Sequence, residues 1–278
     1  MSDHVTIPTA AGKFDALEAG PPSEHGVLLL HGFPESGLQW QRQLGALAQA
    51  GYHAIAPDQR GYSPGVRPET VTEYRMEKLI GDVLAVADRV GWDRFDLVGH
   101  DWGSAVAWSV AGAVPERVST LSALSIPHPE AFGQALAHDP DQQRRSAYMR
   151  LFRSEDAERT LLDEDAARIR ELFEDRVPAE HVTAYLERMR APGALTAALN
   201  WYRAVRHSGA VGRITVPTLY VWSTEDSAVG ARAAEATADY VAGEYRFEVL
   251  DGVSHWMAEE APERVNELLL SHIGGHRR

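Results

Sequence analysis

Three residues of the chain have types and positions that suit nucleophilic catalysis: Asp101, Asp226 and His255. Asp101 has a glycine two positions before it and another two positions after it, between an apolar run and a segment of small residues. This pattern predicts a sharp turn that joins a strand to a helix. The helix dipole there favours a carboxylate, which could attack carbon and form an ester. An alternative interpretation is that Asp101 only caps the helix.

An ester on Asp101 must be hydrolysed before the next turnover, and this requires a base that activates water. The usual base is a histidine that a second carboxylate orients, and His255 follows an apolar run near the end of the chain. Asp226 follows the apolar run before that one and supplies such a carboxylate. Glu225 and Glu130 compete with Asp226 for this role, and we prefer Asp226 for its position.

Alternating apolar runs and helical patterns predict the elements that must position these side chains. The expected strands cover residues 5–7, 14–17, 27–30, 53–56, 95–98, 118–126, 218–222 and 245–250. The expected helices cover residues 40–50, 76–90, 104–114, 231–241 and 262–273. Strands that alternate with helices form a parallel sheet, whose ligands bind at the carboxyl ends of the strands. Asp101, Asp226 and His255 all fall at such ends.

The alternation breaks after the sixth expected strand, where charged residues and alanine are frequent and β-branched runs are rare. Helical patterns in this segment cover residues 163–175, 179–190 and 195–205. We therefore expect a core of residues 1–126 and 210–278, with a helical cap of residues 127–209 inserted into it. The tail from Gly274 onward is expected to be frayed.

The backbone around the turn should supply a further part of the site. Hydrolysis of an ester places negative charge on its carbonyl oxygen, and each N–H donor aimed at that oxygen is worth about 3 kcal/mol. One donor is the amide of the residue after the nucleophile, here Trp102, and the other comes from the loop after the third strand, here Phe33. Pro34 would fix the shape of that loop, and its bond to Phe33 is a candidate cis peptide.

Composition excludes several classes of function. The net charge is −13, which argues against nucleic acid and anionic membranes as partners because both attract basic patches. The chain has no cysteine, so disulfides, thiolate catalysis and cysteine-based metal sites are excluded. Neither a secretory leader pattern nor an apolar run of the ~18 residues that a membrane span needs is present. We expect a soluble, cytoplasmic protein.

Several motifs together resemble the epoxide hydrolases of the α/β-hydrolase fold. They are His31-Gly32-Phe33-Pro34, Gly99-His100-Asp101-Trp102-Gly103, Asn200-Trp201-Tyr202-Arg203 and Ser254-His255-Trp256. Tyr148, four residues before Phe152, resembles the context of a second lid tyrosine of that family. The resemblance covers core and cap. It implies an α/β-hydrolase fold: a mostly parallel central sheet flanked by helices, with a helical cap inserted after the sixth strand.

The resemblance implies a two-step conversion of epoxides to vicinal diols. Asp101 would attack an epoxide carbon while Tyr148 and Tyr202 bind the oxygen and supply a proton, and His255 would then activate water. The alternative for the tyrosines is a packing role. A small hydrophobic epoxide and water are the expected substrates, with no cofactor and no metal. Whether the chain forms a homodimer is left open.

Aromatic residues are the candidates for the substrate pocket. They are Trp102, Phe132 and Trp256, each of which could instead belong to the core. A haloalkane dehalogenase is the first rival, because it also uses an Asp–His–acid triad. Its halide would need two N–H donors, for which Trp102 and Trp201 are the candidates here. A second rival is a non-catalytic member of the fold that binds a ligand.

Overall fold

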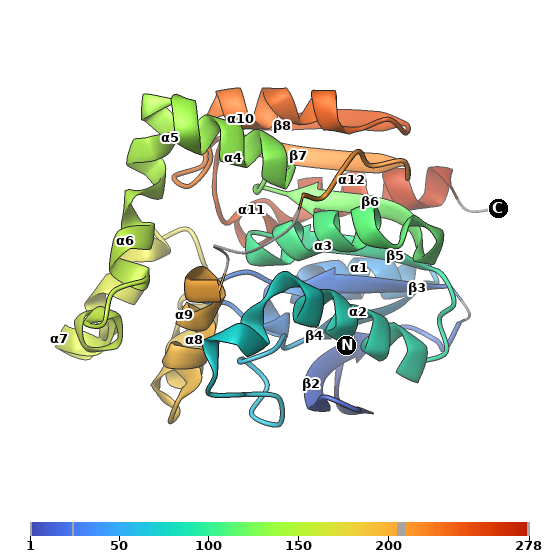
Figure 1. Cartoon of the computed structure of the whole chain (residues 1–278). Helices are drawn as coiled ribbons and strands as arrows, with labels where there is room; N and C mark the ends of the chain where they lie inside the picture. The colour runs from blue at the N-terminus through green and yellow to red at the C-terminus, as the bar shows by residue number, and fades with distance from the viewer. Residues whose placement is uncertain (1, 24, 205–209, 277–278) are drawn as a thin grey trace.

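A mostly parallel sheet of eight strands lies at the centre of the protein (Figure 1). The computed structural model describes residues 2–23, 25–204 and 210–276. The strands are β1 (Asp3–Thr9), β2 (Gly12–Ala19), β3 (Gly26–Leu30), β4 (His53–Pro57), β5 (Phe95–His100), β6 (Val118–Leu124), β7 (Thr218–Glu225) and β8 (Tyr245–Ser254). Their spatial order is β1-β2-β4-β3-β5-β6-β7-β8. β2 is antiparallel to both of its neighbours, and all other pairs are parallel, as the sequence predicts.

Helices cover both faces of the sheet, because the central strands carry apolar side chains on both sides. One face packs against α1 (Gln41–Gln49) and α12 (Pro262–Gly275). The other face packs against α2 (Met76–Arg89), α3 (Trp102–Ala113) and α10 (Ala231–Ala236). This doubly covered sheet holds the carboxyl ends of β5, β7 and β8 at one edge of the core.

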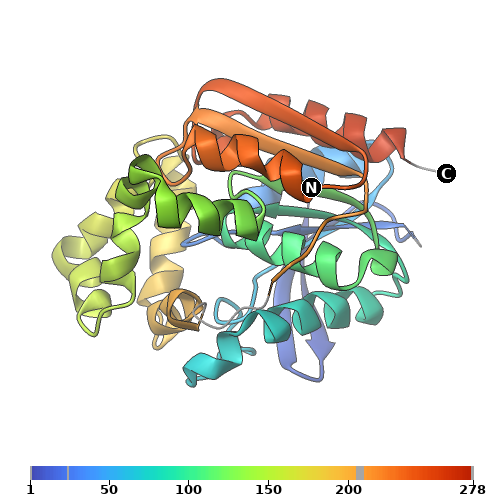
Figure 2. The same cartoon turned by 45° about the horizontal axis from the view of Figure 1, so that its top comes forward.

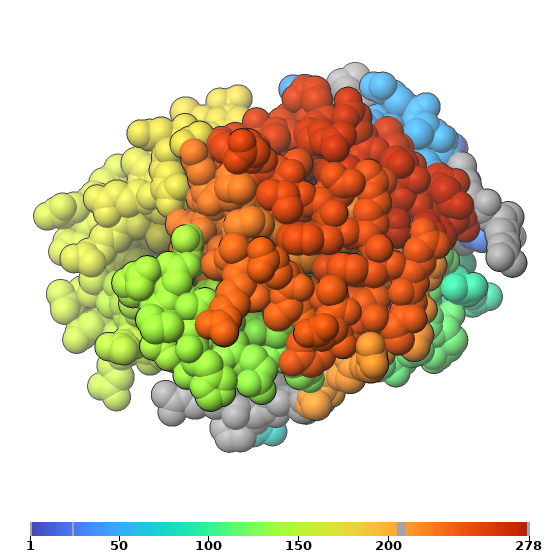
Figure 3. Space-filling view, turned by 90° about the horizontal axis from the view of Figure 1, so that it is seen from above, coloured from blue at the N-terminus to red at the C-terminus, as the bar shows by residue number. Residues whose placement is uncertain are grey.

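Among the described residues, six helices lie between β6 and β7, beyond one end of the strands (Figure 2). They are α4 (Pro129–His138), α5 (Pro140–Arg145), α6 (Met149–Phe152), α7 (Ala157–Leu172), α8 (Ala179–Arg190) and α9 (Ala194–Ala204). Seen from above, the green and yellow surface of this segment lies directly against the orange C-terminal part of the chain (Figure 3). α4 packs on α10, so the segment contacts the core through its first helix as well.

Some predicted elements differ from those observed. α4, α5 and α6 were not predicted; α5 and α6, of six and four residues, are too short to show the helical period. The helix expected at 163–175 begins earlier, at Ala157, and is interrupted by left-handed backbone at residues 164–166. The helix expected at 231–241 ends at Ala236 and continues as a 3₁₀ turn. α12 runs through Gly275, so the prediction of a frayed tail from Gly274 was wrong for these two glycines. Val205, Arg277 and Arg278 lie outside the described residues.

Candidate active site

Asp101 lies in a sharp turn between β5 and α3, as the two flanking glycines predict. Its backbone has φ 49° and ψ −121°, a conformation that a residue other than glycine adopts only at a cost. The turn is tight enough that a Cβ on Gly103 would lie 2.0 Å from the carbonyl oxygen of Leu30. A Cβ on Gly99 would lie 2.3 Å from the Gly103 carbonyl oxygen. Glycine is therefore required at both positions.

The two carboxylate oxygens of Asp101 have different surroundings. Oδ1 accepts a hydrogen bond of 2.9 Å from the Phe33 amide, and the Trp102 amide also binds this carboxylate. Oδ2 lies 3.7 Å from His255 Nε2. Burial raises the pKa of Asp101, and His255 and the two amides oppose that rise. The Phe33–Pro34 peptide is cis. The amides expected to form an oxyanion hole thus bind the carboxylate of the expected nucleophile.

His255 and Asp226 lie beside Asp101, at the ends of β8 and β7. His255 Nδ1 is 3.1 Å from Asp226 Oδ1, and this oxygen also accepts hydrogen bonds from the Ala228 and Val229 amides. Burial lowers the pKa of His255, but the charges of Asp226 and Asp101 outweigh it and raise that pKa to about 9. Burial opposes the ionisation of Asp226, but His255 and two further hydrogen-bond donors hold its pKa below the usual value. The His255 imidazole therefore bridges the carboxylates of Asp226 and Asp101.

Tyr148 and Tyr202 come from different parts of the inserted segment and meet above Asp101. Tyr148 ends the short turn before α6, Tyr202 lies in α9, and their ring centroids are 6.3 Å apart. The Trp102 ring packs edge-on against Tyr202, with ring centroids 5.0 Å apart. Burial, followed by nearby groups including Asp101, raises the pKa of both phenols. Tyr202 and Trp102 partly offset the rise in the pKa of Tyr148 and of Tyr202, respectively. Both hydroxyls therefore stay protonated at neutral pH and can donate.

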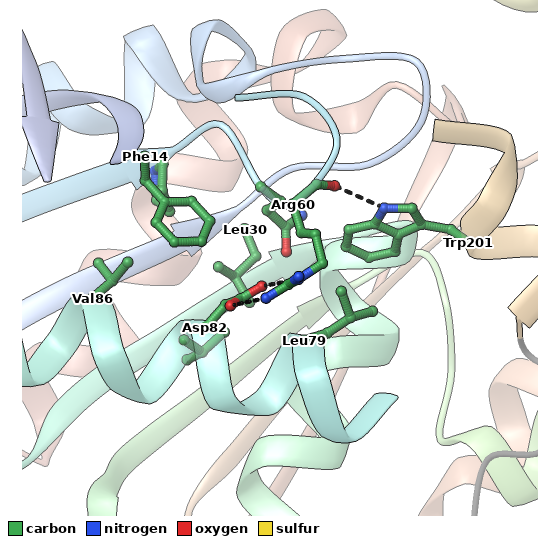
Figure 4. Close-up of a pocket in the computed structure, with 10 residues that line it drawn as sticks. Phe14, Leu30, Arg60, Leu79, Asp82, Val86 and Trp201 are labelled. Atoms are coloured by element: carbon green, nitrogen blue, oxygen red, sulfur yellow. Dashed lines mark hydrogen bonds and ion pairs between the residues drawn. The ribbon is translucent and has the colours of Figure 1, made fainter. Parts of the chain in front are cut away.

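Tyr202 is positioned by its neighbour Trp201, which anchors α9 to the core (Figure 4). The Trp201 indole N–H donates to the Arg60 carbonyl over 2.9 Å. Arg60 in turn makes two hydrogen bonds of 2.6 Å to the carboxylate of Asp82 in α2. Beneath this arrangement is only a small cavity of about 20 Å³, so the anchor is tightly packed. Tyr202 is thus tied to the sheet side of the protein through its neighbour Trp201.

Two cavities meet at Asp101, Tyr148 and Tyr202, which line both of them. The first, of about 460 Å³, is mainly apolar; its lining includes Met76, Trp102, Ile126, Phe132, Leu136 and Met149. The second, of about 390 Å³, also contains charged side chains; its lining includes Arg145, Arg168, Glu171, Glu174, His255 and Trp256. The three predicted pocket aromatics therefore all line these cavities, Trp102 and Phe132 in the apolar one and Trp256 in the charged one.

The two competing carboxylates do not contact His255, although Glu130 lines the apolar cavity. Glu130 is 2.8 Å from His128 Nδ1 and accepts a hydrogen bond from the Val211 amide. Glu225 is exposed and pairs with Arg176 at 2.9 Å. The structure thus brings Asp226, and neither of these two, to His255.

Two groups of residues at the site had no role in the sequence analysis. Ser125 lies 2.6 Å from Asp226 Oδ2. His100, fully buried, lies 2.9 Å from the carbonyl oxygen of His255 and contacts Gln39 and Glu35 on its other side. Burial lowers the pKa of His100 to about 3, so it is neutral. Glu35 could have been noticed in the sequence, because it directly follows Pro34 in the loop at the carboxyl end of β3.

Comparison with known proteins places this geometry in a family. The family model for the alpha/beta hydrolase fold matches residues 27–262. The chain is 36% identical over 256 residues to the AB hydrolase superfamily protein YfhM of Bacillus subtilis, and the match covers 89% of each protein. The predicted α/β-hydrolase fold is therefore confirmed.

Other relatives narrow the family further. Epoxide hydrolase A of Mycobacterium tuberculosis is 31% identical over 314 residues, a match that covers 97% of this chain and 96% of that protein. A solved structure of an epoxide hydrolase found in metagenomes from hot environments has a TM-score of 0.88 and 30% identity, over 99% of this chain and 100% of that one. The chain belongs to the epoxide hydrolases of the α/β-hydrolase fold, as its motifs predict.

Two further observations concern metals and membranes. Among the residues that the structure describes, no group of three or more His, Asp or Glu side chains is arranged to hold a metal ion. Within the same part of the chain, every helix is too short or too polar to cross a bilayer.

Proposed function

We propose that this protein hydrolyses epoxides to vicinal diols through a covalent ester on Asp101. One observation carries the proposal: a buried carboxylate faces a His–Asp pair on one side and two phenol hydroxyls on the other. A carboxylate nucleophile, a base that clears its ester and acids for an oxygen leaving group are what epoxide hydrolysis requires. The names of the relatives support the same reaction. We also propose that residues 127–209 act as the cap of a core formed by 1–126 and 210–278.

The first step forms the ester. Asp101 Oδ2 attacks an epoxide carbon, a C–O bond of the ring breaks, and the ring oxygen takes up negative charge. Tyr148 and Tyr202 donate to this oxygen, and one of them transfers its proton to it. The product of the step is a hydroxyalkyl ester of Asp101. The Phe33 amide remains on Oδ1, which is now the ester carbonyl oxygen, and the Trp102 amide remains bound to the same carboxyl group.

The second step hydrolyses the ester. Neutral His255 takes a proton from water at Nε2, and the resulting hydroxide adds to the ester carbonyl carbon. The amides of Phe33 and Trp102 stabilise the oxyanion on Oδ1, and the alkoxide of the product leaves with Oδ2. The proton of the resulting Asp101 carboxylic acid passes to this alkoxide and completes the diol, and His255 returns its proton to the tyrosinate, so that carboxylate, imidazole and phenol are all restored. In total, one epoxide and one water give one diol.

A dehalogenase is disfavoured by the same contacts. The Trp201 indole N–H is bound to the Arg60 carbonyl. This candidate donor is therefore not available to a halide without breaking an existing hydrogen bond, which leaves Trp102 as the one remaining candidate of the two. A purely binding role is disfavoured because Asp101, His255 and Asp226 are all present, and His255 lies between the two carboxylates.

The test is a search for the ester. In the His255→Gln variant, ester formation should proceed while hydrolysis stops, so that mass spectrometry shows a mass increase equal to the bound epoxide on the peptide with Asp101. The Asp101→Ala variant is the control and should show none. A panel of styrene-type, aliphatic and fatty-acid epoxides should be used beside haloalkanes and esters. Turnover of haloalkanes alone, or labelling of another residue, would overturn the proposal.

A further inference from the structure

Ser125 contacts both members of the pair that the second step uses. Its hydroxyl oxygen lies 2.6 Å from Asp226 Oδ2 and 3.0 Å from His255 Nδ1, and the residue is fully buried. Its φ is 65°, in the left-handed region that L residues other than glycine, asparagine and aspartate rarely adopt. Backbone strain that persists beside a reacting group points to a role at that site.

The surroundings of Ser125 hold it in this conformation. The Tyr220 hydroxyl donates to the Ser125 carbonyl oxygen over 2.7 Å. The next carbonyl, of Ile126, accepts from the Ser104 hydroxyl at 2.7 Å and from the Trp108 indole at 3.0 Å. Three buried donors from α3 and β7 thus fix the turn after β6. The serine hydroxyl is thereby aimed at the triad.

The hydrogen bonds define where each proton lies. Asp226 is ionised, so the short contact to Oδ2 is a hydrogen bond that Ser125 donates. Among the described residues, Oδ2 accepts a hydrogen bond from Ser125 alone. Because its proton is engaged there, the Ser125 oxygen can only accept from His255 Nδ1. Nδ1 must then carry a proton, which it shares between Ser125 and Asp226 Oδ1.

We propose that Ser125 is a positioning residue for ester hydrolysis, which sets the ring orientation and the tautomer of His255 by binding Asp226 and His255 together. A proton on Nδ1 leaves Nε2, the nitrogen that faces Asp101, free to accept a proton from water. Glycine at this position would relieve the backbone strain but would lose the hydroxyl. The inference rests on the proposed ester mechanism and extends it to a residue outside the Asp–His–Asp set.

The test separates the two half-reactions in single-turnover experiments with the full-length Ser125→Ala variant. We expect ester formation within about threefold of the wild type and ester hydrolysis slowed by about 10- to 100-fold, the loss typical of one hydrogen bond to a charged group. In the steady state kcat and KM should fall together. Nitrogen NMR of the neutral His255 ring should show an increased share of the Nε2-protonated tautomer.

Two further variants serve as controls. Ser122→Ala removes a hydroxyl from β6, three residues before Ser125, where the buried side chain has no hydrogen-bond partner, and both steps should be unchanged. Ser125→Gly removes the hydroxyl together with the strain and should show the same slow hydrolysis as Ser125→Ala. Normal hydrolysis in both Ser125 variants would overturn the inference, and so would a proportional loss of both steps.

Failure of the inference can be distinguished from failure of the proposed function. If wild-type protein and the His255→Gln variant never carry an ester on Asp101, the mechanism itself is wrong. If the ester forms and the Ser125 variants hydrolyse it at the wild-type rate, only the role of Ser125 is wrong.

Discussion

His255 must be charged in one step of the proposed reaction and neutral in the next. In the free site, Asp226 and Asp101 together overcome the effect of burial and raise its pKa to about 9. The imidazolium that results stabilises the Asp101 carboxylate before attack. Esterification removes the charge of Asp101 and thus one of the groups that raise the pKa of His255. The charge of Asp101 therefore controls when His255 can lose its proton and act as a base.

This gives a prediction for pH dependence. Because the ester lacks the Asp101 charge, His255 should lose its proton at lower pH in the ester than in the free enzyme, where its pKa is about 9. The rate of ester hydrolysis should therefore rise with pH and level off with an apparent pKa below about 9. Single-turnover rates between acidic and alkaline pH measure this value. An apparent pKa at or above that of free His255 would contradict the argument.

Tyr148 and Tyr202 should affect ester formation and not ester hydrolysis. Replacing Tyr148 or Tyr202 by Phe keeps the ring but removes a donor to the epoxide oxygen. Each single variant should slow ester formation by about 10²- to 10⁴-fold, the usual range for general acid catalysis, and the double variant more. Hydrolysis of a preformed ester should be unchanged. Rapid-quench measurement of both rates tests this, and equal losses in the two steps would indicate a packing role.

The residues of the site differ in how far the sequence revealed them. Asp101 was recognisable because the glycines that its turn requires are two positions away on either side. His255 and Asp226 were recognisable because each follows an apolar run. Ser125 was not, since its partners are more than a hundred positions away and meet it only through the pairing of β6 with β7. Long-range pairing of this kind leaves no local pattern.

At the scale of elements, α7 has an unusual break. Glu164, Asp165 and Ala166 all have positive φ, between 48° and 60°, although none of them is glycine. The second half of this helix supplies Arg168, Glu171 and Leu172 to the wall of the charged cavity. The break therefore sets the angle at which this wall closes the site. The composition of the segment did not predict it, because these residues favour a regular helix.

Relief of this strain should stabilise the protein. Glu164 is exposed and has φ 48°, so Glu164→Gly should raise the free energy of unfolding by about 0.5–1 kcal/mol. Glu187 is exposed in the regular part of α8, and Glu187→Gly should lower that free energy by about 1 kcal/mol. Urea unfolding of the two variants checks the opposite signs. A loss of stability in both would show that residue 164 is not strained.

Core and inserted helices together determine which substrates can reach Asp101. The site lies where an apolar cavity meets a charged one, so an epoxide bound there can extend a substituent into each. Apolar surface gains about 25 cal/mol per Å² when it is buried, which favours an apolar substituent in the first cavity. The sequence predicted the aromatic lining but not this division, because the packing of the inserted helices creates it.

Filling the apolar cavity should therefore change substrate preference. Gly133 in α4 lines this cavity, and a Cβ there would meet no atom within 4 Å. Gly133→Leu should lower kcat/KM by about tenfold or more for epoxides with a long apolar substituent and spare short ones. Gly81→Leu is the matched control, because Gly81 lies exposed in α2 with equally open space. Equal effects on long and short substrates would contradict the expected selectivity.

The overall architecture was easier to predict than the arrangement of the helices inserted between β6 and β7. Continuous apolar runs such as Val27–Leu30 predicted the parallel sheet, since only strands covered on both faces have them. The motif around Tyr202 indicated one lid tyrosine. Its position over Asp101, however, depends on the contact of Trp201 with Arg60, which joins segments 141 residues apart.

The unequal surroundings of the Asp101 carboxylate have an isotopic consequence. Oδ1 is held by the Phe33 amide and stays on the protein, whereas Oδ2 departs with the diol and an oxygen from solvent replaces it. After many turnovers in water enriched in oxygen-18, Asp101 should therefore carry one heavy oxygen and not two. The first diol released should be unlabelled at the new hydroxyl, because that atom was supplied by the protein. Two heavy oxygens on the peptide would mean that the carboxylate rotates between turnovers, so the count reports how firmly the two amides hold it.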